Sequence, residues 1–178
     1  MKRTKKLEST AYHEAGHALT GHLLPHADPV QKVSIVARSM VGGYTRFIPP
    51  EDRYMTTKAQ FEDMLATALG GRAAEKLMVN EITTGASNDL EVATRLARNM
   101  VTRFGMSEKL GPRTFGKREE LIFLGREITE QRDYSDKVAE VIDEEVHDLI
   151  QYAYSTTMDL LTMHKAKLVQ LARHLLRN

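Results

Sequence analysis

The chain has 178 residues, of which 42% are hydrophobic, and this is enough for one domain with a sizeable core, or for one domain with a helical extension. Cysteine is absent, which excludes a disulfide framework and a thiolate metal site, so a metal would have to be held by histidine and carboxylate. The 25 basic and 24 acidic residues leave a net charge of +1, so we expect no nucleic-acid partner. We also expect no membrane span, because no run approaches ~18 consecutive apolar residues. A signal peptide is not expected either, because Glu8 and Ser9 follow the basic start where a long apolar stretch would be needed.

The first chemical motif along the chain is HEAGH at residues 13–17, which matches the HExxH pattern of zinc hydrolases. On an α-helix, His13 and His17 differ by only ~40° around the axis, so both imidazoles can reach one metal ion. A catalytic zinc site keeps its fourth position for water. The pattern therefore predicts that His13 and His17 bind zinc and that Glu14, which lies beside them, activates this water.

A helix around this motif is predicted by an apolar stripe of alanine and leucine residues. Ser9 or Thr10 can serve as its N-cap, and Pro25 ends it. The alternative is that the motif consists of ordinary helix residues with a solvated acid between them.

A catalytic zinc site needs a third protein ligand, and the residues alone leave its identity open. The motif does not continue as HExxHxxGxxH, because Thr20 and Leu23 occupy the two decisive positions. The acids at positions 28, 51 and 52 lie beside prolines and not on a facing helix. Glu75, late in a predicted helix, and Asp89, in the first turn of the next helix, remain as candidates. His22 and His26 are also available, although His22 lies ~140° from His17 around the helix and should point elsewhere. An acid is also favoured in a first helical turn simply because it faces the helix dipole.

Two strands are predicted after the first helix. Alternation of apolar and polar residues indicates a strand over 30–36, followed by a turn over 38–43 and a second strand over 44–48. An extended polypeptide could bind along an exposed strand edge, because backbone hydrogen bonds accept any sequence. Residues 44–48 are our candidate for this edge.

Two helices are predicted next. Thr57 and Gln60 form a capping box for a helix that runs to about residue 78. Two consecutive glycines at 70–71 each cost this helix ~1 kcal/mol relative to alanine, which indicates a close backbone approach there. Ser87 or Asn88 is predicted to cap another helix that ends at about residue 103.

The remaining third of the chain is predicted to be irregular at first and then helical. Glycines mark an irregular connection over 105–116, and a short strand is expected at 121–124. From residue 135 onward, apolar residues recur at helical spacing and indicate a helical pair or bundle. We therefore divide the chain into a core over 1–133, which carries the HExxH motif, and a C-terminal helical extension over 134–178 that packs on the core.

Several ordered blocks of the sequence together carry a family resemblance. The blocks are TAYHEAGHA at 10–18, LPHADPV at 24–30, GGRAAE at 70–75, TTGASNDL at 83–90, FLGR at 123–126, RDYS at 132–135 and IDEEV at 142–146. They resemble the protease domain of the FtsH family, whose members are membrane-anchored, ATP-dependent zinc proteases of bacteria, mitochondria and chloroplasts. The likeness covers nearly the whole chain and departs from the family only over 115–120, which looks short.

The resemblance implies a specific set of site residues. The third zinc ligand in that family is the aspartate of the TTGxxxD block, which is Asp89 here, so the implied ligands of one zinc ion per chain are His13, His17 and Asp89. The resemblance places Glu75 near the site without making it a ligand.

The resemblance also implies partners and location. Family members carry an AAA ATPase module and transmembrane helices before the protease domain, so we expect this chain to be a soluble C-terminal fragment that meets ATP only through the missing module. The full-length protein is expected to be a homo-hexamer in the cell inner membrane, with this domain facing the cytoplasm or an organelle matrix or stroma.

Together these observations predict a mainly α fold, a helical zinc metalloprotease domain with a small β-sheet and a C-terminal helical subdomain. Its expected reaction is hydrolysis of peptide bonds in unfolded or membrane-extracted polypeptides delivered by a linked AAA ATPase ring. Two alternatives stay open, a catalytically silent metal-stabilised hexamer-assembly domain and a small-molecule zinc hydrolase, although the intact Glu14 argues against the silent form. Tyr12, Tyr44 and His22 are equal candidates for a second donor to the oxyanion.

Overall fold

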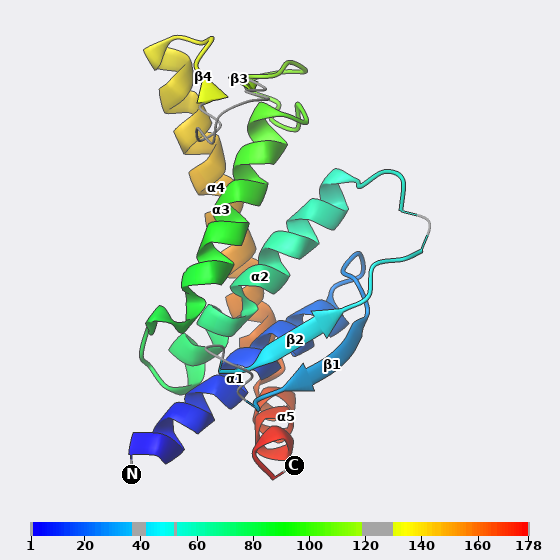
Figure 1. Ribbon diagram of the computed structural model, residues 1–178, viewed down its shortest axis with the longest axis vertical. Helices are drawn as coiled ribbons and strands as arrows, with labels where there is room; N and C mark the ends of the chain where they lie inside the picture. The colour runs from blue at the N-terminus through cyan, green and yellow to red at the C-terminus, as the bar shows by residue number, and fades with distance from the viewer. Residues whose placement is uncertain (1, 37–41, 52, 119–129, 178) are drawn as a thin grey trace, which may run out of the picture.

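A computed structural model describes residues 2–36, 42–51, 53–118 and 130–177. This part of the chain is mainly α-helical with a small β-sheet, which confirms the predicted fold class (Figure 1). Its elements in chain order are α1 (Lys2–Leu23), β1 (Val30–Ser34), β2 (Tyr44–Phe47), α2 (Lys58–Met78), the 3-10 helix η1 (Thr84–Ala86), α3 (Ser87–Thr102), β3 (Lys117–Arg118), β4 (Glu130–Gln131), α4 (Asp136–Met163) and α5 (Lys165–Arg177).

Helices α1 and α2 approach each other closely at glycines. A Cβ atom on Gly16 would lie 2.3 Å from the carbonyl oxygen of Gly70, and a Cβ atom on Gly70 would lie 2.7 Å from that of Gly16. Real side chains do not tolerate such distances to backbone, so both positions need glycine. This contact is the close approach that the paired glycines predicted, and it brings α2 against the HEAGH motif.

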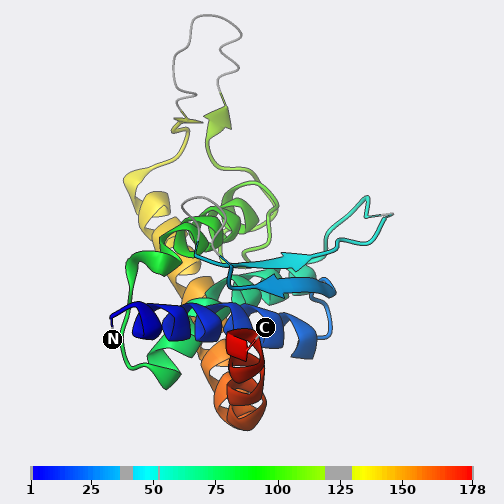
Figure 2. The ribbon, with the colours of Figure 1, turned by 60° about the horizontal axis from the view of Figure 1, so that its bottom comes forward.

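Helix α4 contributes residues to more than one cluster of the hydrophobic core and so connects these clusters. Its Leu161 packs with residues of α1, α2 and α5, and its Ala153 packs with residues of α2 and α3. The buried hydroxyl of Thr157 donates to the carbonyl oxygen of Ala66, 2.9 Å away, and so links α4 to the middle of α2. Figure 2 shows α4 and α5 as the predicted helical pair, packed against the other helices. The division of the chain at residue 133 stays a prediction.

Strands β1 and β2 form a two-stranded antiparallel sheet alongside α1 (Figure 2). Val33 lies opposite Thr45 and Ser34 lies opposite Tyr44, with an irregularity in register between Val30 and Lys32. Among the described residues, β2 pairs only with β1, so its second edge is unpaired. Both strands are one or two residues shorter than predicted.

Two predicted N-caps are wrong and one is confirmed. Helix α1 begins at Lys2, because the lysines and arginine before the motif are themselves good helix formers, and Ser9 and Thr10 lie inside it. Helix α3 begins at Ser87 without a side-chain cap, since η1 leads directly into it. The capping box of Thr57 and Gln60 on α2 is present.

Two further expectations concern the rest of the chain. The strand predicted at 121–124 lies outside the described residues. Within the described ranges, no helix combines the length and the apolar character that crossing a membrane requires.

Candidate metal centre

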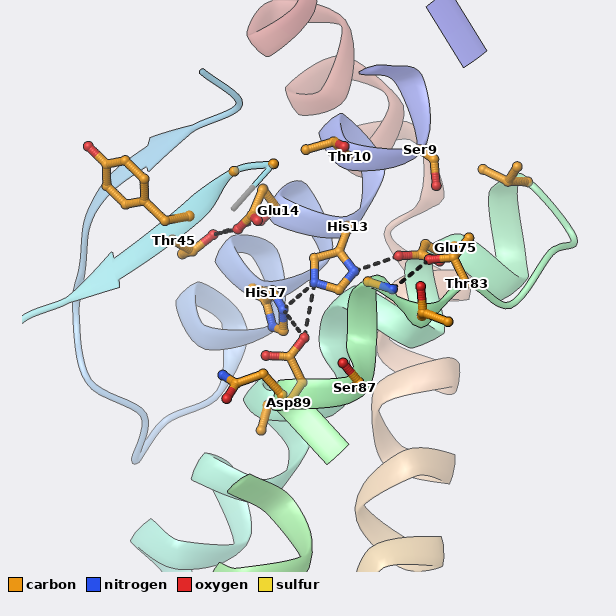
Figure 3. Close-up of a pocket in the computed structure, with 18 of the residues that line it drawn as sticks. Ser9, Thr10, His13, Glu14, His17, Thr45, Glu75, Thr83, Ser87 and Asp89 are labelled. Atoms are coloured by element: carbon orange, nitrogen blue, oxygen red, sulfur yellow. Dashed lines mark hydrogen bonds and ion pairs between the residues drawn. The ribbon is translucent and has the colours of Figure 1, made fainter. Parts of the chain in front are cut away.

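His13 and His17 point from α1 toward one point, and Asp89 from the first turn of α3 meets them there (Figure 3). The Nε2 atoms of the two histidines are 3.0 Å apart. The Asp89 Oδ2 atom lies 3.0 Å from Nε2 of His13 and 3.1 Å from Nε2 of His17. Both histidines are 8% exposed, so the three donors converge in a largely buried place.

The chemistry and spacing of these donors fit a zinc ion. Two imidazole nitrogens and one carboxylate oxygen are donors that zinc prefers, and three protein ligands plus one open position are typical of a catalytic site. Ligand atoms ~2.0–2.2 Å from a tetrahedral zinc ion lie ~3.3 Å from each other. The three observed separations are slightly shorter than this value, so a small outward movement of the side chains would accommodate the ion.

Hydrogen bonds at the far side of each imidazole fix which nitrogen faces the centre. The Nδ1 atom of His17 donates to the backbone carbonyl of Thr67 at 2.8 Å, and the Nδ1 atom of His13 donates to Oε1 of Glu75 at 2.6 Å. With the proton on Nδ1, the lone pair of each Nε2 is directed at the metal position. Partners of this kind orient metal-binding histidines and raise their basicity.

Glu75 thus supports His13 from α2 and does not face the centre itself. Its side chain is buried at 3% exposure, and its second oxygen accepts from the Thr83 hydroxyl at 3.0 Å. Thr83 also accepts from the backbone N–H of Gly85, at the start of η1. The segment that leads to Asp89 is therefore tied to the partner of His13 (Figure 3).

Helix α2 closes the back of the centre at Gly71. A Cβ atom there would lie 2.5 Å from Cε1 of His13 and 2.6 Å from Nε2 of His17. Only glycine leaves room for both imidazoles.

The carboxylates around His13 change its proton affinity. Burial disfavours the charged imidazole, but hydrogen bonds to Asp89 and Glu75 outweigh this effect and raise the pKa of His13 to about 9. Burial also opposes ionisation of Asp89, yet hydrogen bonds from His13 and His17 lower its pKa below the ordinary value of 3.8. The centre therefore favours a positive charge among its donors, which either a proton or a metal ion can supply.

Glu14 lies next to the centre on α1 and is 6% exposed. Its Oε2 atom accepts a hydrogen bond from the hydroxyl of Thr45 on β2, at 2.8 Å. Figure 3 shows this contact on the side of the centre opposite Glu75. Glu14 thus lines the same cleft as the three donors, and its role as a base stays a prediction.

The centre opens into a cleft of about 1380 Å³. Side chains of α1, β2, α2 and the 83–89 segment line it, and His13, Glu14, His17 and Asp89 all reach it. Of the three candidate oxyanion donors, Tyr44 lines the cleft, whereas Tyr12 packs in the core and His22 is exposed away from it.

Asp28 and Glu51 were also considered from the sequence, together with Asp52, which lies outside the described residues. Asp28 lines the same cleft but forms an ion pair with Arg53. Three supporting residues, Thr45, Thr67 and Thr83, were not predicted. Their contacts depend on which elements pack together, and threonine carries no spacing signal of its own.

Comparison with known proteins identifies the family to which this chain is related. The family model described as "Peptidase family M41" matches residues 1–178. The chain is 61% identical over 163 residues to "ATP-dependent zinc metalloprotease FtsH 1" of Sphaerobacter thermophilus, and 62% identical over 163 residues to the protein of that name from Thermomicrobium roseum. Each of these alignments covers 92% of this chain and 25% of the relative.

A protein of the same name from Conexibacter woesei is 50% identical over 181 residues, which covers 99% of this chain and 28% of the relative. The chain thus spans about a quarter of the length of the curated relatives it matches. These findings confirm the family resemblance that the sequence blocks indicated. The chain belongs to peptidase family M41.

Proposed function

We propose that this chain is a zinc metalloendopeptidase domain in which His13, His17 and Asp89 bind one zinc ion and Glu14 is the general base. The observation that carries the proposal is the convergence of the three donors, with Nε2 of both histidines turned inward. The name shared by the relatives, zinc metalloprotease, agrees with this donor set.

Each residue has a defined part in the proposed reaction. Zinc, when bound, lowers the pKa of a water toward ~7 and polarises the scissile carbonyl. The carboxylate of Glu14 accepts a proton from the attacking water and returns it to the leaving amine. Glu75 and Thr67 hold the imidazoles of His13 and His17 in place. Burial of all these groups strengthens their electrostatic interactions.

A polypeptide substrate suits the shape of the site. Strand β2 lines the cleft, and its second edge, which is unpaired in the described part of the chain, can offer backbone hydrogen-bonding groups to an extended polypeptide. A polypeptide bound there would lie beside Glu14 and the metal position. A small-molecule substrate would leave most of the cleft volume of about 1380 Å³ unused, which favours the endopeptidase over the small-molecule hydrolase.

We further propose that the full-length protein delivers substrates by ATP hydrolysis. The relatives are named ATP-dependent, and this chain corresponds to about a quarter of their length. Our proposal for the whole protein is a membrane-attached homo-hexamer whose ATPase ring feeds unfolded or membrane-extracted polypeptides to this domain. The orientation of the domain toward the cytoplasm, or toward an organelle matrix or stroma, belongs to the same proposal.

The test compares the zinc-loaded chain with its Glu14→Gln variant on short fluorogenic peptides, which need no unfolding, with bound zinc measured in both. We expect cleavage by the parent and a loss of on the order of 10²- to 10⁴-fold in the variant, at equal zinc content. Glu140→Gln, an exposed acid on α4, is the control and should behave as the parent. Zinc binding without cleavage by the parent would contradict the endopeptidase and support the silent assembly domain.

A further inference from the structure

Residues of β2 and of the segment before it contact the carboxylate of Glu14. It is 6% exposed, and a buried carboxylate needs hydrogen bonds to compensate for the water it has lost. Of the described residues, Thr45 alone donates a hydrogen bond to this carboxylate. The conformation of Glu14 therefore depends on one hydroxyl group.

The hydroxyl of Thr45 contacts both ends of the same residue. Its Oγ1 atom lies 2.8 Å from Oε2 of Glu14 and 3.1 Å from the backbone carbonyl oxygen of Glu14. A hydroxyl has one proton, which these two acceptors share. Because the main-chain and side-chain oxygens of Glu14 converge on one point, the rotatable bonds between them are restricted.

Gly43 limits the same carboxylate from another direction. A Cβ atom on Gly43 would lie 2.9 Å from both Cγ and Oε1 of Glu14, and 3.0 Å from the carbonyl oxygen of Ser34. The backbone of the segment that enters β2 therefore lies directly against the side chain of Glu14. Thr45 and Gly43 together confine the carboxylate between the sheet and α1.

The position of the Thr45 hydroxyl is itself well determined. A β-branched side chain has few allowed rotamers in a strand, and Thr45 is paired with Val33 across the sheet. A slip of register by one residue would turn Thr45 to the opposite face of the sheet. Tertiary packing of β2 on α1 thus sets the direction of the hydrogen bond to Glu14.

We propose that Thr45 is a positioning residue that orients the Glu14 carboxylate for water activation. This inference rests on the proposed role of Glu14 as general base. Thr45 acts through Glu14 and needs no contact of its own with the metal or the scissile bond. Its contribution should therefore appear in the rate of the chemical step and not in substrate or zinc binding.

The main test is the pair Thr45→Val and Thr45→Ser, measured with zinc-loaded protein and a short fluorogenic peptide. Valine keeps the β-branched shape without the hydroxyl, whereas serine keeps the hydroxyl. We expect Thr45→Val to lower kcat by on the order of tenfold with KM and zinc content unchanged, because a misplaced catalytic group slows the reaction without affecting binding. Thr45→Ser should recover most of the rate. Thr94→Val, an exposed threonine on α3 whose hydroxyl bonds the Leu90 carbonyl, is the control.

A second measurement separates positioning from structural support. In a Glu14→Gln background, Thr45→Val should cause no further loss of kcat, since the group it orients is already gone. A double-mutant cycle on the unfolding of the metal-free protein, with Thr45→Val and Glu14→Ala, should show coupling between the two positions.

The outcomes distinguish the two proposals. If Glu14→Gln retains the parental rate, the base assignment itself is wrong. If Glu14→Gln is inactive while Thr45→Val matches the parent, or if serine is as slow as valine, only the positioning role is overturned. A rise in KM or a loss of zinc in Thr45→Val would likewise contradict it.

Discussion

At the scale of single residues, two acids near the centre play different parts. Asp89 Oδ2 faces both Nε2 atoms, whereas Glu75 contacts the opposite nitrogen of His13. The sequence offered both acids as third ligands, and only the family resemblance chose between them. The geometry supports Asp89 in our proposed ligand set and shows Glu75 in contact with the far side of the His13 ring.

This difference predicts unequal effects on zinc affinity. Asp89→Ala should lower the affinity by more than ~100-fold, because it removes a donor atom. Glu75→Gln should lower it by ~10- to 100-fold at most, because the amide oxygen of glutamine still accepts from His13. Competition with a chromophoric chelator measures both values, and Glu91→Gln, an exposed acid on α3, serves as the control. A greater loss in Glu75→Gln than in Asp89→Ala would reverse the assignment.

At the scale of elements, the contact of α1 with α2 decides whether the histidines of the HEAGH motif have room to bind a metal ion. Helical periodicity alone places His13 and His17 on one face of α1. The packing of α2 on that face depends on three glycines. At Gly16 and Gly70 the backbone of the other helix occupies the space that a side chain would need, and at Gly71 the two imidazoles occupy it. Glycine has a lower helix propensity than alanine, by ~1 kcal/mol per residue. The close contact between the helices outweighs this cost at each of the three positions.

Adding one methyl group at two adjacent positions of α2 should therefore have two distinct effects. Gly71→Ala should reduce zinc affinity severely while the helices remain, because the new Cβ displaces the imidazoles and not the backbone. Gly70→Ala should lower the free energy of unfolding of the metal-free protein by about 1–3 kcal/mol, because its Cβ meets the backbone of Gly16. Zinc titration and urea unfolding of both variants measure these effects. Parental zinc affinity in Gly71→Ala would show that the centre tolerates this displacement.

At the scale of the whole molecule, α4 joins three clusters of the core. Leu161 packs with α1, α2 and α5, Ala153 packs with α2 and α3, and Ile142 packs with Val101 and Phe115. The elements that carry the metal centre are thus held against one another partly through α4. Figure 1 shows its length relative to the shorter helices around it.

The dependence on α4 predicts that a chain ending at residue 133 will not fold by itself. Its loss would expose the apolar faces of α1, α2 and α3 to water, at ~25 cal/mol for each Å² of apolar surface. We expect the shortened chain to lack a cooperative thermal transition in circular dichroism and to bind a hydrophobic dye. The full chain is the control. A cooperative transition in the shortened chain would instead support an autonomous core over residues 1–133.

The sequence by itself determined the features that arise from near neighbours along the chain. The HEAGH spacing, the capping box of α2, the two strands and the two C-terminal helices all follow from local periodicity or local hydrogen bonds. The predicted N-caps of α1 and α3 were wrong. Helix α1 begins earlier in the chain, at Lys2, and the 3-10 helix η1 leads directly into α3. The sequence also identified the paired glycines as a sign of close packing without naming the partner.

Only the tertiary structure decided which distant groups meet. Asp89 lies 72 positions from His17 along the chain, and Thr45 lies 31 positions from Glu14. No periodicity extends over such separations, because the contacts depend on how α1, α2, α3 and the sheet pack in three dimensions. The residues of the candidate centre could thus be nominated from the sequence, whereas the hydrogen bonds that orient them required the packed fold.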